Sequence, residues 1–317
     1  ARYFNLEKSK KEFEKIVSEI DVDLVYFNTI VLAPYLETCK SLGLKTIIHI
    51  REHWPLNEHK FQLSRLQNCI AKNADQIIAI NSYSASLVPN RKSTIVYDWI
   101  DFSERYEYLP FNKIFNQDTT NLKVFLYTGG QQNIKGFYEV VNAFSNHIKS
   151  DDCRLLILGV EGEIKSNGIR GGIKRLLYNI GYDYKRRKAL RLIQNDSRIV
   201  CINATYMMKH IFQQSYCNLS YFTIPHANLG LAESIVLGTV SIAAKNEESL
   251  EYSDNGNLAI LYKSNDFNDF LRSIKTLDDN YETIKHRLQN NDVIERMFDR
   301  KLNAEKLSKI YLDLLHN

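Results

Sequence analysis

The chain has 317 residues, of which 44% are hydrophobic and 25% charged, so it is long enough for two globular domains of ordinary size. It contains no run of about 18 apolar residues, which excludes a predicted membrane-spanning helix, and its first residues, ARYFNLEKSKKEFEK, are too charged for a signal peptide. Five scattered cysteines without a CxxC pair favour reduced thiols in the cytoplasm over disulfides or structural zinc.

Short apolar runs alternate with helical patterns through the first hundred residues. The runs at 24–28, 46–50, 76–80 and 94–98 predict strands, and apolar residues at helical spacing lie between them. Strands and helices in strict alternation indicate a parallel sheet with crossover helices.

The stretch HIREHW (49–54) ends the second of these strands and carries His49, Arg51, Glu52 and His53, which are candidate site residues. Alternation along a strand would place Arg51 and His53 on one face with His49. An ion pair of Arg51 with Glu52 or a neighbour is the structural alternative. No stretch of the chain has the histidine or carboxylate spacing of a metal site, so we predict no metal ion and no cofactor.

The pattern restarts after residues 108–121, which contain Pro, Asn, Asp and Thr without a clear period and predict a linker. Further predicted strands lie at 123–129, 154–159, 198–202, 217–222 and 240–244. We therefore expect an N-terminal α/β domain over 1–107, a second α/β domain over 122–290 and a C-terminal helix over 291–317 that packs on the first domain. In open parallel sheets ligands bind beyond the carboxyl ends of the strands, so a cleft between the two sheets is the expected site.

The segment YTGGQQNIKGFYEVVNAF (127–144) predicts a strand, a glycine turn and a helix with Lys135 near its start. The pair Gly129 and Gly130 lets backbone amides approach a ligand closely, and a helix N-terminus beside a lysine suits a phosphate group. An ordinary turn with a solvated lysine explains these residues equally well. Gly159, at the end of the next strand, marks a second glycine turn that needs no ligand to explain it.

One segment carries an excess of positive charge. Residues 165–191 contain nine Lys and Arg against one acid, a local sum of +8, although the whole chain sums to only +4. Attachment to an anionic membrane surface would suit such a helix, since each basic residue there contributes about 1 kcal/mol. A solvated helix with its apolar stripe on the core is the equally weighted alternative. Nucleic acid is disfavoured, because no aromatic side chains interleave with the basic ones.

The stretch HANLGLAESIVLGTVSIAA (226–244) combines a polar loop, a helix and an apolar strand. We predict Glu233 in the first turn of that helix, where the helix dipole favours a carboxylate whatever its function. The same carboxylate could accept hydrogen bonds from two adjacent hydroxyl groups of a ribose. The order of glycine loop, glutamate, apolar helix and buried strand favours the functional interpretation over capping.

These motifs together resemble those of a GT-B glycosyltransferase of the retaining, family 4 type, over most of the chain. The family's Gly-Arg and Lys-Gly pairs correspond to Gly129-Gly130 and Lys135-Gly136, so the lysine is matched and the arginine is not. Glu233 matches the second glutamate of the family's later motif, whereas Pro225 stands where the first belongs. The N-terminal half resembles the family more loosely, through DVDLVYFN, TIIHIREHWP, ADQIIAINSYSASLV and KSTIVYDWIDFSE.

The resemblance implies two Rossmann-like domains that face each other across a cleft, with the first strand and glycine loop of the N-terminal domain not found in this sequence. It implies that the second domain binds the donor. The residues that contact the donor nucleotide match the family, whereas those that contact the donor sugar differ from it. The implied donor-binding residues are Gly129, Gly130, Lys135, Gly159, His226, Asn228, Leu229, Gly230 and Glu233. The implied acceptor-side residues are His49, Arg51, Glu52 and His53, and the implied catalytic side chains are Lys135, Glu233 and His53.

The resemblance implies transfer of a hexosyl unit from a nucleotide-sugar donor to a glycan or lipid-linked acceptor in bacterial-type surface polysaccharide synthesis. Configuration would be retained, no metal ion would be needed, and the location would be the cytoplasm or the inner face of its membrane. The alternative is a catalytically silent GT-B-like module that binds a partner or a glycan, favoured by the unmatched arginine and glutamate. An epimerase on the same fold is a third possibility, and it would need no acceptor.

Overall fold

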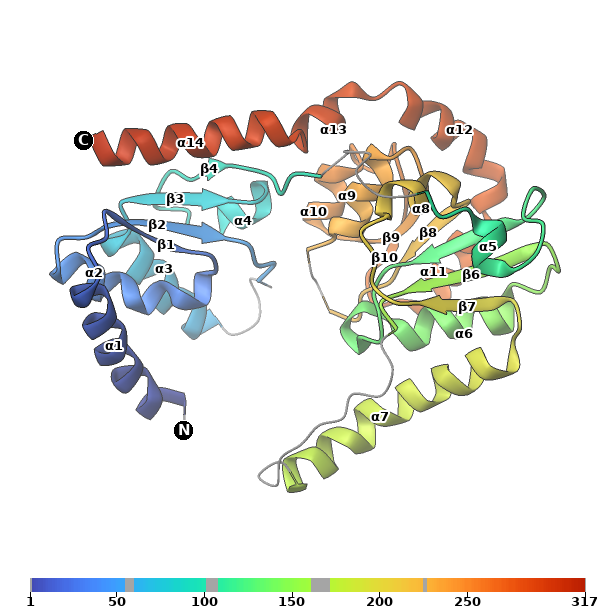
Figure 1. Cartoon of the computed structure of the whole chain (residues 1–317), viewed down its shortest axis with the longest axis horizontal. Helices are drawn as coiled ribbons and strands as arrows, with labels where there is room; N and C mark the ends of the chain where they lie inside the picture. The colour runs from blue at the N-terminus through green and yellow to red at the C-terminus, as the bar shows by residue number, and fades with distance from the viewer. Residues whose placement is uncertain (1, 55–59, 101–107, 161–171, 225–226, 317) are drawn as a thin grey trace. The chain divides into compact units, whose positions relative to one another are not determined.

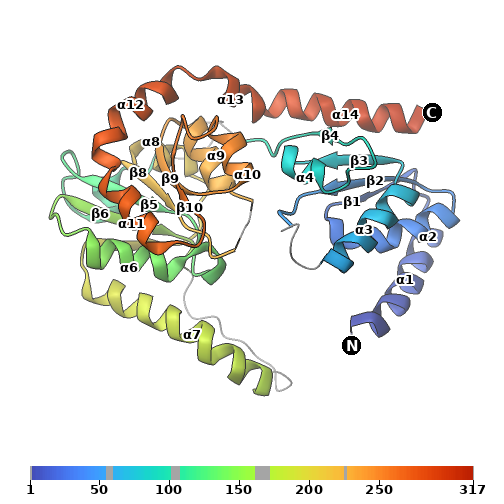
Figure 2. The same ribbon diagram turned by 180° about the vertical axis from the view of Figure 1, so that it is seen from behind.

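The computed structural model describes residues 2–54, 60–100, 108–160, 172–224 and 227–316 (Figure 1). The chain forms two compact units: the first combines residues 1–100 with 296–317, and the second spans 101–295. Each unit is built on one parallel sheet, which Figure 2 shows from behind. The predicted class, α/β with two Rossmann-like domains, is therefore confirmed.

The sheet of the first unit has four parallel strands in the order β1-β2-β3-β4, so strands that follow each other in the chain are also neighbours in space. The described elements of this unit are α1 (Arg2–Glu19), β1 (Leu24–Phe27), η1 (Ile30–Tyr35), α2 (Leu36–Ser41), β2 (Lys45–Ile50), α3 (Lys60–Asn73), β3 (Gln76–Ala79), α4 (Ser82–Ser86), β4 (Thr94–Ile95) and α14 (Arg300–His316); α13 (Asp292–Met297) lies at the boundary with the second unit.

Both faces of this first sheet are covered by helices. Along β2, Ile48 and Ile50 are part of the core that also contains residues of η1, α2 and α3. Ile47 points to the opposite face, where Ile310 of α14 packs against its cluster. Buried Asn303 fixes the start of α14, because its side-chain oxygen accepts a hydrogen bond of 3.1 Å from the Tyr97 amide. The C-terminal helix thus completes the core of the unit that the N-terminal residues begin.

The sheet of the second unit has six parallel strands in the order β10-β9-β8-β5-β6-β7. The described elements are α5 (Phe111–Phe115), β5 (Lys123–Tyr127), η2 (Asn133–Lys135), α6 (Phe137–His147), β6 (Cys153–Leu158), α7 (Gly172–Asn195), β7 (Ile199–Ile202), α8 (Met208–Gln214), β8 (Cys217–Ser220), α9 (Leu229–Val236), β9 (Val240–Lys245), α10 (Glu247–Tyr252), β10 (Ile260–Lys263), α11 (Phe267–Lys275) and α12 (Leu277–Gln289).

Side chains of β5 alternate between the two faces of this second sheet. Val124 and Leu126 belong to a core that also includes Phe111 of α5 and Phe212 of α8. Phe125 contacts Phe144 of α6 on the other face. Residues 108–121, which we predict as a linker, thus contain a short helix whose buried Phe111 is part of the second unit's core. None of the helices in the described parts of the chain is long and apolar enough to span a bilayer.

Candidate functional site

A cavity lies at the carboxyl ends of β5 and β8, where the strand order of the second sheet reverses. From β5 the chain winds outward through β6 and β7, returns to β8 on the other side of β5, and then winds outward through β9 and β10. This is the strand order of a dinucleotide-binding sheet, and such sheets bind ligands in the crevice at this reversal. The cavity is lined by Tyr127, Thr128, Gly129, Lys135, Leu219, Ser220, Tyr221, Phe222, Ala227, Asn228, Leu229 and Gly230.

The volume of this cavity is about 80 Å³. A water molecule in the liquid occupies roughly 30 Å³, so the cavity has room for a group the size of a phosphate and not for a whole nucleotide. It is therefore a subsite, and the rest of any larger ligand would lie along the loops around it.

The glycine loop after β5 is folded tightly over Tyr127. The Tyr127 hydroxyl donates a hydrogen bond of 3.0 Å to the carbonyl of Lys135, which fixes both ends of the loop. A Cβ atom on Gly129 would lie 2.2 Å from that hydroxyl, so only glycine fits there. Lys135 is held at the cavity as the last residue of η2, in a turn that precedes α6 rather than within the helix.

Gly159 supports the same loop from the neighbouring strand. A Cβ atom on Gly130 would lie 3.0 Å from the Gly159 carbonyl, and both glycines have positive φ, +58° and +77°. The turns after β5 and β6 therefore pack backbone against backbone. Gly159 does not line the cavity, which makes close packing a sufficient reason for a glycine at this position.

Asn228 places a hydrogen-bond donor at the cavity. Its side-chain oxygen caps α9 by accepting from the Leu231 amide and also accepts from the Ser220 hydroxyl, both at 3.1 Å. Its own amide donates to the buried carboxylate of Glu248 at 3.1 Å. The side-chain nitrogen of Asn228 has no partner in the described part of the chain, although the residue is only 3% exposed. A buried donor without a partner is costly.

The neighbours of Asn228 complete this side of the cavity. Gly230 lies close to Thr128, because a Cβ atom on it would be 3.0 Å from the threonine hydroxyl. Leu229 lines the cavity and stays 44% exposed. His226, which we predict beside them, lies outside the described residues.

Glu233 does not lie where the sequence suggested. It is the fifth residue of α9, which begins at Leu229, so it occupies the second turn and the first-turn prediction is wrong. The capping role belongs to Asn228, whose side chain accepts a hydrogen bond from the Leu231 amide. The capping interpretation of Glu233 therefore fails together with the assignment to the first turn.

Glu233 and Lys135 nevertheless share one electrostatic environment. Burial raises the pKa of Glu233 to about 7, and the positive charge of Lys135 acts in the opposite direction. Glu233 is not among the described residues that line the cavity, whereas Lys135 is. Within the described residues the two groups form no ion pair, and the Glu233 carboxylate accepts no hydrogen bond. A carboxylate suits hydroxyl groups and an ammonium group suits phosphate.

His49 is a buried residue of the first unit. It lies on β2, is 5% exposed, and forms a hydrogen bond of 2.5 Å through Nδ1 with the Tyr26 hydroxyl. Burial, followed by the nearby charge of Arg51, lowers the pKa of His49 to about 4. The imidazole is therefore neutral at physiological pH.

The other three acceptor-side candidates follow β2, which ends at Ile50, so the alternation that we predict for Arg51 and His53 lies outside the strand. Arg51 forms its ion pair with Asp98, at 2.7 Å, and not with Glu52. His53 stacks on Tyr83 of α4, with ring centroids 4.2 Å apart.

Glu52 is bonded within its own unit. Its carboxylate accepts hydrogen bonds from the backbone amides of Ile30, at 3.0 Å, and Arg51, at 3.1 Å, and from the Thr29 hydroxyl. These bonds tie the start of η1 to the end of β2. Sequence reasoning missed Asp98 as the partner of Arg51 and residues 29 and 30 as partners of Glu52, because all three lie more than 20 residues away in the chain and approach only through the folding of the sheet.

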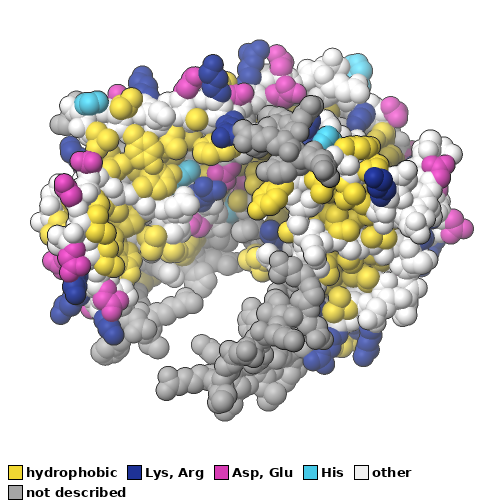
Figure 3. All heavy atoms as spheres, viewed as in Figure 1, with side chains coloured by type: hydrophobic (Ala, Val, Ile, Leu, Met, Phe, Trp, Pro, Cys, Tyr) yellow, Lys and Arg dark blue, Asp and Glu magenta, His cyan; other side chains and the backbone are white. Residues whose placement is uncertain are grey.

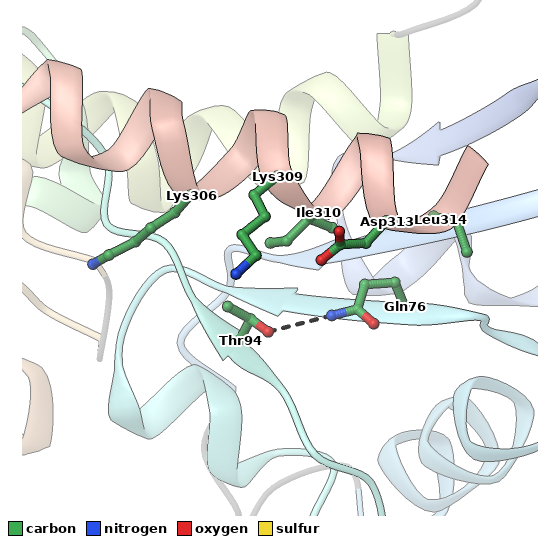
Figure 4. A pocket seen from close by; sticks show the side chains of 7 residues that line it. All are labelled: Gln76, Thr94, Lys306, Lys309, Ile310, Asp313 and Leu314. Atoms are coloured by element: carbon green, nitrogen blue, oxygen red, sulfur yellow. Dashed lines mark hydrogen bonds between the residues drawn. The ribbon is translucent and has the colours of Figure 1, made fainter. Parts of the chain in front are cut away.

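A second, larger cavity of about 460 Å³ lies in the first unit between α14 and the sheet (Figure 4). Lys306, Lys309 and Asp313 of α14 line it together with Gln76 and Thr94, which form a hydrogen bond of 3.2 Å. Gln76 and Thr94 begin their strands, so this groove lies at the amino ends of β3 and β4. Ligands of parallel sheets bind at the opposite ends, which makes the smaller cavity of the second unit the better candidate.

The basic segment is described in part. Residues 165–171, and the side chains as far as residue 183, lie outside the described part of the chain. Beyond them α7 exposes basic side chains, and Figure 3 shows Lys and Arg on the surface there. Within the described residues, no group of three or more His, Cys, Asp or Glu side chains is arranged to hold a metal ion.

No family model and no curated protein matches the sequence. Solved structures with a similar fold include HepE of Anabaena in complex with UDP and glucose, with a TM-score of 0.73 and 14% identity over 97% of this chain and 81% of that one. A glycosyltransferase from Rickettsia africae ESF-5 has a TM-score of 0.70 and 14% identity, over 98% of this chain and 81% of that one. Sucrose-phosphate synthase of Thermosynechococcus elongatus has a TM-score of 0.69 and 14% identity, over 98% of this chain and 78% of that one. At these identities the likeness shows the fold, the GT-B arrangement of two Rossmann-like domains.

Proposed function

We propose that this chain is a glycosyltransferase that takes a hexosyl unit from a nucleotide-sugar donor. The observation that carries the proposal is the cavity at the strand reversal of the second sheet, which is lined by Gly129 of the glycine loop, Lys135 and Asn228. A glycine loop beside a lysine at this position suits a sugar diphosphate. The similar structures support it, because one of them holds UDP and glucose.

The proposed roles follow from the chemistry of each group. Backbone amides of Gly129 and Gly130 and the ammonium group of Lys135 would stabilise the charge that develops on the diphosphate as it leaves, which is the kind of electrostatic term that dominates in many enzymes. Glu233 would accept hydrogen bonds from the ribose hydroxyls. His226, Asn228, Leu229 and Gly230 would contact the sugar.

The acceptor would be a glycan or a lipid-linked oligosaccharide bound by the first unit. Arg51 and His53 remain our candidates there, with His53 as the catalytic side chain. His49 and Glu52 fit this role less well, because His49 is buried on a sheet face and Glu52 is bonded to backbone amides. Retention of configuration, independence from metal ions, membership of family 4 and a role in surface polysaccharide synthesis at the inner face of the membrane are further parts of the proposal, supported by the sequence resemblance alone.

Thermal unfolding with UDP, GDP and ADP tests the proposal first. A ligand at 100 times its dissociation constant stabilises the folded state by about 2.7 kcal/mol, so the correct nucleotide raises the unfolding temperature clearly and the other two do not. No response to any nucleotide would favour the silent module. Incubation with nucleotide sugars then separates the remaining classes, because an epimerase changes the donor sugar without an acceptor and a transferase releases nucleoside diphosphate.

A further inference from the structure

The larger cavity of the first unit takes no part in the proposed transfer reaction. It has a volume of about 460 Å³ and lies between α14 and the amino ends of β3 and β4 (Figure 4). Cavities that bind small molecules usually have volumes of about 300–1,000 Å³. This cavity is therefore large enough for a whole small molecule, whereas the cavity of the second unit, at about 80 Å³, holds only part of one.

The cavity exists because α14 is much longer than β4, the edge strand that lines the cavity with it. α14 has 17 residues, whereas β4 has two residues that each rise about 3.3 Å. Ile310 and Leu314 pack against the cluster of Ile47, Ile78 and Val96, and they also form the apolar part of the lining. The apolar side of α14 is thus held on the sheet, while the short edge strand covers only part of the helix.

The charged part of the lining carries two positive charges against one negative charge. Lys306 and Lys309 lie three residues apart on α14, a spacing that places both side chains on one face of a helix. Asp313 is the one carboxylate among the described residues that line the cavity. Neither lysine forms an ion pair or a hydrogen bond with another described residue. The net charge of the lining therefore favours an anion, and both ammonium groups keep hydrogen-bond donors for it.

Thr94 and Gln76 supply a further hydrogen-bond donor from the sheet. The side-chain nitrogen of Gln76 donates to the Thr94 hydroxyl oxygen at 3.2 Å, so the hydrogen of that hydroxyl can be donated to a ligand. Figure 4 shows Lys309 pointing from α14 toward the strand that carries Thr94. Two ammonium groups and a hydroxyl donor suit a carboxylate or a phosphate, and the Gln76 side-chain oxygen suits a hydroxyl group of the same ligand.

We propose that this cavity is a second ligand site, which binds a small organic anion with a carboxylate or phosphate group and with hydroxyl groups. Lys306, Lys309 and Thr94 hold the anionic group, and Ile310 and Leu314 contact the carbon skeleton. Such a ligand contacts α14 and the sheet at the same time, so it holds the C-terminal helix more firmly on the first unit. The inference goes beyond the proposed function and does not depend on it, because every residue that it uses belongs to the first unit.

Methyl NMR spectra of the whole chain, recorded during titration with malate, glycerol 3-phosphate and neutral glycerol, test this site. The methyl signals of Ile310 and Leu314 should shift in a saturable way with at least one of the two anions and not with glycerol. The anion that saturates at the lower concentration identifies the preferred group, carboxylate or phosphate.

Four variants of α14 locate the anionic group. Lys306→Gln and Lys309→Gln should each raise the dissociation constant of the anion by about threefold or more, because a charged hydrogen bond in a partly exposed site is lost. Lys309→Arg keeps the charge and should keep most of the affinity. Lys301→Gln removes an equal charge from the same helix outside the cavity lining, so it should leave the constant unchanged.

UDP binding separates this site from the cavity of the second unit. Lys306→Gln and Lys309→Gln should leave the dissociation constant of UDP unchanged, and Lys135→Ala should leave the anion-dependent methyl shifts unchanged. The proposal is overturned if neither anion causes a saturable shift, if glycerol binds as well as the anions, or if Lys301→Gln weakens anion binding as much as the two cavity variants do. A chain that binds no UDP but shows the anion-dependent shifts loses the proposed function and keeps this second site.

Discussion

The carboxyl ends of the two parallel sheets differ in what their polar side chains contact. At the end of β2 in the first unit, Arg51 is paired with Asp98, Glu52 accepts backbone amides, and His53 stacks on an aromatic ring. In the second unit, Asn228 lines the cavity at the ends of β5 and β8, and its side-chain nitrogen has no partner among the described residues. Glu233, on α9, accepts no hydrogen bond from those residues.

The strand orders explain much of this difference. In the first sheet the chain moves steadily from β1 to β4, so consecutive loops lie side by side and bond to one another. In the second sheet the order reverses between β5 and β8, so their loops diverge and leave a crevice. Polar groups that lose water without gaining a partner cost about 1–3 kcal/mol each. Buried polar atoms without a partner among the described residues occur in both units, for example His49 Nε2 on β2 and the Asn228 side-chain nitrogen. The reversal of strand order, and not the unpaired groups, therefore makes the edge of the second sheet the better candidate site.

The largest expected effect concerns His49, whose buried ring makes it a structural residue in this comparison. Its pKa in the folded state is about 4, below the ordinary 6.5, so between these values the unfolded chain binds a proton that the folded chain does not. The free energy of unfolding should therefore fall as the pH drops from 6.5 to 4, by about 3 kcal/mol in total from this residue. His49→Gln should lack this part of the pH dependence. Urea unfolding at pH 7.5, 5.5 and 4.5 measures the free energy of unfolding of both proteins. If that free energy falls equally with pH in the wild type and the variant, the assignment to His49 is contradicted.

Lys135→Ala should have the next largest effect, and on binding alone. A charged hydrogen bond to phosphate contributes about 2 kcal/mol, or about 30-fold in dissociation constant. The stability of the protein should hardly change, because the Lys135 side chain is only partly buried and forms no ion pair in the described part of the chain. Calorimetry with UDP measures the first quantity and thermal unfolding the second. Lys275→Ala, on exposed α11 of the same unit, is the control for loss of one positive charge.

Glu233→Gln connects binding to stability. The carboxyl keeps its proton to about pH 7 in the folded state and loses it near 4.5 when unfolded, so the wild type should lose stability as the pH rises from 4.5 to 7. The free energy of unfolding should fall by about 2 kcal/mol, which is less than the full pKa shift implies because the side chain keeps some solvent contact. Glu233→Gln should not show this fall, so it should be more stable than the wild type at pH 8 and yet bind UDP less tightly there. A variant that is more stable and binds equally well would remove Glu233 from the site.

The sequence predicted the elements that local patterns determine. Alternating apolar runs and helical spacing specify strands and crossover helices, and the paired glycines specify the tight turn after β5. Glu233 was placed one turn too early because the apolar pattern does not mark where a helix begins. Asn228 does mark it, since asparagine is a favoured N-cap residue.

Contacts between distant segments were beyond the reach of the sequence. Arg51 lies next to Glu52 in the chain, but its partner is Asp98, which the pairing of β2 with β3 and of β3 with β4 brings near. Likewise, Phe111 follows a proline in an irregular segment. Its burial depends on α8, where Gln214 accepts a hydrogen bond of 3.1 Å from the Phe111 amide. Such partners follow from tertiary structure alone.

The smallest expected effect is also the one that tests the first unit most directly. The ion pair of Arg51 and Asp98 is partly exposed, with side chains 38% and 30% accessible, and burial raises the pKa of Asp98 more than Arg51 lowers it. Removing such a pair should cost at most about 1 kcal/mol, so Arg51→Ala, Asp98→Asn and the double variant should unfold close to wild type, with a small coupling between them. None of the three should alter UDP binding. If the rate of transfer to an acceptor falls strongly in Arg51→Ala but not in Asp98→Asn, the guanidinium acts on the acceptor and the ion pair only holds it in place. If the rates of both variants fall in proportion to their loss of stability, these residues of the first unit are structural.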